Sequence, residues 1–101
     1  TGGVRCRVKV DAAITLLSQR RNTLRKSELI DVLQSLGFSV RRGSNGNHHT
    51  YLHTGLAPER FYGASFDGGH GADAQLRACY VDTARRVLST YREALNALLG
   101  E

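Results

Sequence analysis

Apolar and polar positions along the chain predict helical segments near both ends, with short alternating segments between them. One clear apolar stripe has the spacing of a single helix face and consists of Leu29, Ile30, Leu33 and Leu36. Thr23 can serve as the N-cap of this helix, and Gly37 supplies the left-handed residue that commonly follows a helix. The pattern therefore predicts a helix that begins after Thr23 and ends at Leu36.

The start of the chain fits two interpretations. Apolar residues alternate with basic ones over residues 4–10, as in a strand, while Val10, Ala13, Ile14 and Leu17 have helical spacing. Because Asp11 can act as an N-cap, we favour a helix over residues 11–20, with residues 5–9 as an extended lead-in. Residues 1–3 have nothing to pack and are interpreted as a truncation or tag remnant.

Three segments in the middle of the chain have strand character. Residues 38–42 and 48–53 flank the polar turn 43–47, which predicts a hairpin. After a loop marked by Gly55 and Pro58, the aromatic segment 61–66 predicts a third strand, followed by a flexible exit over residues 67–71. Apolar residues then recur at helical spacing over residues 81–99 and predict one long closing helix, to which residues 75–80 add either first turns or a separate piece.

The predicted order of elements is helix, helix, three strands, helix. A three-stranded antiparallel sheet must bury one face under helices to be stable. We therefore expect an α+β fold with a three-stranded antiparallel sheet and helices packed on one face. The 101 residues have the size of a single domain, with residues 1–22 as an N-terminal extension and residues 23–101 as the core.

Charge is distributed unevenly along the chain, whose net charge is +5. Residues 1–60 contain ten Lys and Arg against four Asp and Glu, whereas residues 61–101 contain four against five. This asymmetry favours a polyanionic partner such as nucleic acid.

No apolar stretch has the length of a membrane span, and no signal peptide is visible, so we expect a cytoplasmic protein without membrane contact. Cys6 and Cys79 form no CxxC pair and are expected to be ordinary small hydrophobes.

Three histidines lie on the second predicted strand. Alternation places His49 and His53 on one face and His48 on the other. A metal site would have to combine His49 and His53 with His70 or Asp67, a spacing that matches no recognised metal motif. We therefore expect neither a metal nor another cofactor.

His48 is a candidate proton-transfer residue. It follows a Gly/Asn turn in which Gly46 allows close backbone approach, and an imidazole can move a proton at neutral pH. The alternative is a surface histidine without a role. Four cations could hold phosphates near His48, two at the end of the first strand and two at the start of the second helix: Arg41, Arg42, Arg25 and Lys26. Tyr51 and Tyr62 could stack on bases, but we expect one of them in the core.

A family resemblance runs through this part of the chain. The run from Lys26 to Phe38, followed by basic residues, a Gly-rich turn and His48-His49-Thr50-Tyr51-Leu52-His53, resembles the HicA toxins of bacterial toxin–antitoxin systems. The resemblance covers about residues 24–88 and is strongest over residues 26–53. It implies a double-stranded-RNA-binding-domain-like order, α-β-β-β-α, here with an extra N-terminal helix and an extended C-terminal helix.

The resemblance also implies a function and a site. Gly46-Asn47-His48 takes the place of the family's Gly-Ser-His, which makes His48 the catalytic histidine. His49 occupies the following, less essential position, and His70 loosely matches a further family histidine. The implied activity is a metal-independent endoribonuclease that cleaves messenger RNA and is held inactive by a HicB-type antitoxin.

Two other classes of function remain open at this point. A non-catalytic module could bind structured RNA by shape, through phosphate and 2′-hydroxyl contacts. A protein-binding adaptor would explain the apolar stripe of the closing helix but not the charge asymmetry. The extra helical segments before Thr23 and after Leu88 leave a homodimer, or a cover over the site, as further alternatives.

Overall fold

The computed structural model describes residues 2–43, 48–59, 61, 63–68 and 75–99. Its elements follow one another in the expected order, helices first, then the sheet, then helices: α1 (Gly2–Gln19), α2 (Lys26–Ser35), β1 (Ser39–Arg42), β2 (His48–Leu52), the 3-10 helix η1 (Thr54–Glu59), β3 (Ala64–Asp67), α3 (Ala78–Thr90) and α4 (Arg92–Leu98). The predicted α+β class with a three-stranded antiparallel sheet is confirmed. No helix in this described part of the chain is long and apolar enough to cross a membrane.

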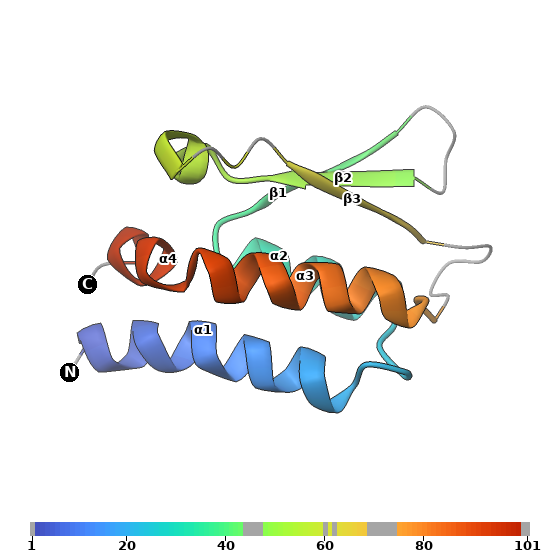
Figure 1. Ribbon diagram of the computed structural model, residues 1–101, viewed down its shortest axis with the longest axis horizontal. Coiled ribbons are helices and arrows are strands. Elements are labelled where there is room, and N and C mark those ends of the chain that lie inside the picture. The colour runs from blue at the N-terminus through green and yellow to red at the C-terminus, as the bar shows by residue number, and fades with distance from the viewer. Residues whose placement is uncertain (1, 44–47, 60, 62, 69–74, 100–101) are drawn as a thin grey trace.

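The elements form layers, with the sheet on one side and α1 on the other (Figure 1). α2 packs against β1 and α3 packs against β3, so both helices cover the same face of the sheet. α1 packs against α3 and α4, on the side of α3 that faces away from the sheet. The prediction that helices cover one face of the sheet is therefore confirmed, and the outer face carries no helix of the described chain (Figure 1).

The strand order is β1-β2-β3, and both pairs are antiparallel. Arg41 pairs with Thr50, and Thr50 pairs with Ser65, so these three residues form one row across the sheet. Burial alternates along β2: His49 and Tyr51 are buried beneath the helices, whereas His48 and Thr50 are exposed. The predicted alternation of faces along this strand is confirmed.

All four α-helices, together with η1 and the connecting segments, contribute leucine, valine or alanine to one core. The buried apolar residues are Val10, Ala13 and Leu17 of α1, Leu29 and Leu33 of α2, Val81, Ala84 and Leu88 of α3, Leu95 of α4, and Leu24, Leu36, Leu56 and Leu76 between elements. Four aromatic rings complete it: Phe38, Tyr51, Phe61 and Phe66. The sheet is therefore fixed from one side by a mixed aliphatic and aromatic layer.

The expected extended lead-in over residues 5–9 is wrong, because α1 is one continuous helix from Gly2 to Gln19. Residues of this segment do not add a fourth strand to the sheet, which consists of β1, β2 and β3 among the described residues. Asp11 is not an N-cap but lies within the helix, where Arg92 Nε donates to its Oδ1 at 2.5 Å. The helical stripe that begins at Val10 thus decides between the two interpretations.

α2 begins later than predicted. Its N-cap is Arg25 rather than Thr23, and the Glu28 carboxylate accepts the Arg25 backbone N–H at 3.0 Å. A tertiary contact accompanies the delay: buried Leu24 accepts the Leu76 backbone N–H at 2.9 Å, and Arg25, whose backbone is extended, forms a bridge with Gln75. The C-terminal end is as predicted: Gly37 has φ +94°, and the Phe38 N–H donates to the Leu33 carbonyl at 3.0 Å, as in a Schellman motif.

Three further expectations need correction. The loop after β2 contains η1, and β3 begins only at Ala64, because Phe61 is used in the core, where its ring lies 6.0 Å from that of Phe38. The closing helix is not continuous but divides into α3 and α4 at Tyr91, whose backbone has φ −105° and ψ 21° and whose ring packs on Phe61. Cys79 is exposed on α3 rather than packed as a small hydrophobe.

Tyr51 gives the fold a testable pH dependence. Its side chain is buried, its hydroxyl has no hydrogen-bond partner among the described residues, and burial raises its pKa to about 12. Between pH 10 and 12 the unfolded chain releases this proton while the folded chain keeps it. The contribution of protonated Tyr51 to the free energy of unfolding is therefore complete below pH 10. Between pH 10 and 12, we expect the free energy of unfolding to fall by about 1.4 kcal/mol per pH unit.

Urea unfolding of the wild type and Tyr51→Phe at pH 8, 10 and 11.5 measures this contribution. The variant is expected to be at least as stable as the wild type at pH 8, because it removes an unpaired buried hydroxyl. The stability difference should then grow in favour of the variant as the pH rises. An unchanged difference from pH 8 to 11.5 would contradict a buried, protonated Tyr51.

Candidate nucleic-acid interface

One end of the molecule gathers the predicted site elements. The start of β2, the end of β3 and the first turns of α2 and α3 all lie at the end opposite the two marked termini (Figure 1). His48 is the first residue of β2, and Asp67 is the last residue of β3. Arg25 and Lys26 begin α2 at the same end.

His48 is exposed on the outer face of the sheet, opposite the helices. Its carbonyl accepts the Gly43 backbone N–H at 2.6 Å, which closes the hairpin ladder at this point. A Cβ atom placed on Gly43 would lie only 3.6 Å from Cδ2 of the His48 ring. A larger residue at position 43 would therefore contact the imidazole, whereas Gly43 has no side chain to do so.

Arg41 shares the outer face with His48. Its pairing with Thr50 places it one row along the sheet from His48 and diagonally across from it. Such diagonal neighbours have Cα atoms about 7–8 Å apart, within reach of a long side chain. The exposed Arg41 guanidinium is thus placed to hold a phosphate beside the imidazole.

The other predicted cations are arranged differently. Arg42 pairs with His49, so its side chain leaves the sheet on the helix side, although the edge position keeps it exposed. Arg25 and Lys26 start α2, which packs beneath that same face. Of the four predicted phosphate-binding residues, only Arg41 therefore shares the face of His48. The other three flank it at the same end of the molecule.

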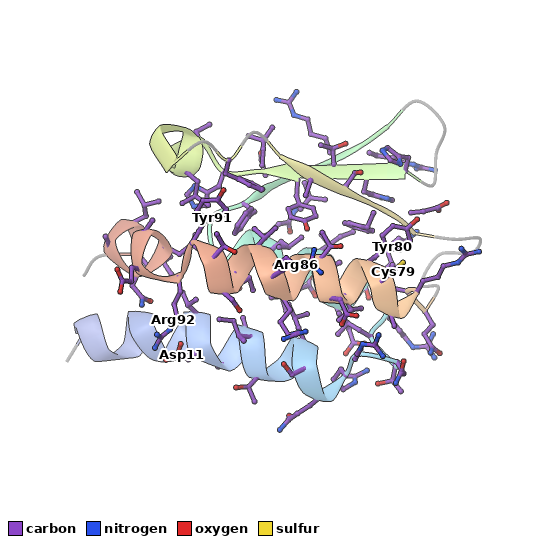
Figure 2. All side chains as sticks on the ribbon, in the orientation of Figure 1. Asp11, Cys79, Tyr80, Arg86, Tyr91 and Arg92 are labelled. Atoms are coloured by element: carbon purple, nitrogen blue, oxygen red, sulfur yellow. The ribbon has the colours of Figure 1, made fainter. Side chains whose placement is uncertain are left out.

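Three further arginines form ion pairs that link the helices or the turn after α1. Arg20 pairs with Glu28 at 2.8 Å, and Arg92 pairs with Asp11, linking α4 to α1 (Figure 2). Arg21 Nε donates to both oxygens of Asp82, and this hydrogen bonding lowers the pKa of Asp82. These cations hold the helices together, which separates them in role from Arg41.

His49 and His53 belong to the packed side of the sheet rather than to the site. The His49 ring is buried and stacks on Phe66, with centroids 5.1 Å apart and planes 4° apart. His53 uses both ring nitrogens: Nδ1 accepts the Gly55 N–H at 3.1 Å, which leaves Nε2 to donate to the Leu36 carbonyl at 3.2 Å. No group of three His, Cys, Asp or Glu residues in the described part of the chain could hold a metal.

His53 is expected to be structural, because it ties the end of β2 to the end of α2. His53→Ala should lower the free energy of unfolding by about 1–3 kcal/mol, since it leaves the Gly55 N–H and Leu36 carbonyl without this partner. The same measurement with excess chelator or Zn²⁺ should give unchanged stability of the wild type. A melting temperature that rises with Zn²⁺ and loses this rise in His53→Ala would instead indicate a metal ligand.

Tyr51 fulfils the expectation that one of two tyrosines lies in the core, where its ring meets Phe38 edge-on at 5.9 Å. Four predicted site residues lie outside the described residues: Gly46, Asn47, Tyr62 and His70.

The sequence placed Asp67 in the flexible exit after the third strand and considered it only as a metal ligand, whereas it is the last residue of β3 and is exposed on the outer face. Asp67 pairs directly with His48, with both residues at the same level of the sheet. The only sequence signal was its place at the end of a strand-like run, and the register between β2 and β3 could not be counted across the loop of residues 53–63. Thr50 and Ser65 add hydroxyls to the same face, in the row of Arg41.

Comparison of the chain with protein-family models, with curated proteins and with solved structures finds no match. The functional argument therefore depends on the residues of the outer face.

Proposed function

We propose that this chain is a HicA-type toxin, a cytoplasmic endoribonuclease that cleaves messenger RNA and is neutralised by a HicB-type antitoxin. The observation that carries the proposal is the exposed His48 on the face of the sheet opposite α2 and α3, with Arg41 on the same face. The sequence resemblance, centred on this same histidine, supports it.

His48 can perform the proton transfers of metal-independent RNA cleavage. It takes the proton of a ribose 2′-hydroxyl, whose oxygen forms a bond to the adjacent phosphorus while the bond from phosphorus to the 5′-oxygen breaks. The same imidazole then returns the proton to the departing 5′-oxygen. The products are a 2′,3′-cyclic phosphate and a 5′-hydroxyl, so atoms and charge balance without another reactant.

Arg41 contributes binding and charge stabilisation. A guanidinium donates two parallel hydrogen bonds to phosphate oxygens and stays charged throughout. The negative charge that develops at phosphorus in the transition state would meet Arg41 at the diagonal position. Arg25, Lys26 and Arg42 extend the positive surface around this end and can hold the flanking phosphates.

An antitoxin that inhibits this site has to cover the outer face of the sheet. That face carries exposed polar residues rather than a helix, so a partner can reach it without displacing any described element. Occlusion would block RNA and shield His48 together.

The test is cleavage of a mixed-sequence RNA by the purified chain in excess chelator, followed by analysis of the ends. We expect 2′,3′-cyclic phosphate and 5′-hydroxyl ends, and no cutting at a position substituted with a 2′-deoxynucleotide. The same preparation of His48→Ala excludes a contaminating nuclease.

RNA binding that weakens with salt, without cutting, would instead support the non-catalytic binding module. Absence of both binding and cutting would contradict a nucleic-acid function of either kind.

A further inference from the structure

The carboxylate nearest to His48 on the outer face is fixed by the sheet itself. His48 and Asp67 are direct cross-strand partners in the antiparallel pair of β2 and β3. Directly opposed residues have Cβ atoms about 4.5–5.5 Å apart and project to the same face. Both residues are exposed, and their strand neighbours His49 and Phe66 are buried on the other face. The imidazole and the carboxylate therefore leave the sheet side by side.

The position of Asp67 is unusual for its residue type. Aspartate is depleted in strands, because its short side chain competes with the backbone for hydrogen bonds. Here it nevertheless pairs with a histidine at the level where β2 begins and β3 ends. An exposed cross-strand pair of this kind contributes only about 0.2–1 kcal/mol to stability. The pairing with His48 by itself therefore adds little to stability.

A carboxylate beside a working histidine has a defined chemical use. It accepts a hydrogen bond from one ring nitrogen, which fixes the tautomer and leaves the other nitrogen as the one that exchanges a proton with substrate. It also stabilises the imidazolium that exists between the two proton transfers. Thr50 and Ser65 offer neutral hydroxyls on this face and cannot supply that charge.

We infer that Asp67 is a positioning residue for His48. Its carboxylate orients the His48 imidazole across the β2–β3 pair, so that the other ring nitrogen is directed toward the RNA. This inference rests on the proposed ribonuclease activity for its consequence. The orientation itself is a property of the folded chain and can be measured without RNA.

The first arm of the test measures that orientation. Histidine side-chain ¹H–¹⁵N spectra are compared for the wild type, Asp67→Asn and Asp31→Asn, with the His48 signals assigned from their loss in His48→Ala. Asp31 is exposed on α2, so Asp31→Asn is a control with the same change of charge. We expect the His48 ring nitrogens to shift in Asp67→Asn and to stay in place in Asp31→Asn. Unmoved His48 signals in Asp67→Asn overturn the inference.

The second arm measures cleavage under single-turnover conditions. Asp67→Asn is expected to cut about 10- to 100-fold more slowly, the effect usual for a group that orients a functional histidine. Asp67→Glu should recover part of this loss, and RNA affinity should stay within about threefold of the wild type. In the His48→Ala background, Asp67→Asn should cause no further loss, because the two residues act as one unit.

The outcomes separate the inference from the proposed function. If the His48 ring signals shift in Asp67→Asn but the wild type does not cut RNA, the ribonuclease proposal is contradicted. The orientation of His48 by Asp67 is then still supported. Cleavage by Asp67→Asn at the wild-type rate would overturn the role of Asp67 and leave His48 as the catalytic residue.

Discussion

Replacement of His48 by alanine is expected to lower the rate constant of RNA cleavage by about 10²–10⁴-fold, the range that positioned acid–base groups contribute. The loss should appear in the chemical step, because the proposal assigns proton transfer to His48 and phosphate binding to Arg41 and the flanking cations. The RNA concentration that gives half-maximal rate should therefore change little. Single-turnover cleavage with saturating enzyme isolates this step.

Two controls make the result specific to His48. Ser65→Ala changes an exposed side chain on the same face of the sheet and should stay within about threefold of the wild-type rate constant. Circular dichroism should show that His48→Ala remains folded, because the side chain is exposed and its removal opens no core cavity. Equal cleavage by wild type and His48→Ala would exclude His48 from the reaction.

Phe66→Ala is expected to lower the free energy of unfolding by about 3–5 kcal/mol, the usual cost of truncating a buried phenylalanine. The Phe66 side chain is 1% exposed, stacks on His49 and lies 6.2 Å from the Tyr51 ring. Truncation of Phe66 removes its contacts with His49 and Tyr51. It also leaves a cavity on the helix side of the sheet, opposite the face that carries His48. Thermal and urea unfolding of the variant measure the loss.

Leu98→Ala is the matched control, because Leu98 is also apolar but 47% exposed. Its effect should stay within about 1 kcal/mol. Small domains have only about 5–15 kcal/mol of net stability, so Phe66→Ala should also reduce the folded fraction available for cleavage at 37 °C. A stability loss below about 1 kcal/mol would contradict the buried position of Phe66 against His49 and Tyr51.

Local signals in the sequence predicted the elements that depend on few neighbours. Gly37 ended α2 as expected, since a left-handed residue at a helix end needs only glycine and the preceding turn. The alternation that separates His48 from His49 also followed directly from strand geometry. The faces of β2 could thus be assigned without knowledge of the rest of the fold.

The errors arose where distant segments decide the local structure. Leu76 holds Leu24 by a backbone hydrogen bond, and this contact accompanies the shift of the helix start from Thr23 to Arg25. The pairing of His48 with Asp67 depends on the path of the chain through η1, which no local pattern revealed. Likewise, the division of the closing helix at Tyr91 accompanies packing against Phe61. Each case needs tertiary information that a propensity cannot contain.

The ion pair between Asp11 and Arg92 has a consequence for how the chain folds during translation. These residues are 81 positions apart, and the main packing partners of α1 are α3 and α4. During translation, the ribosome must therefore release α3 and α4 before α1 meets these partners. Contacts of such long sequence separation slow folding. A nascent chain that ends before α3 already carries His48, Arg41 and α2 but lacks α3, which packs against β3. We therefore expect it to acquire any activity only after α3 has been synthesised.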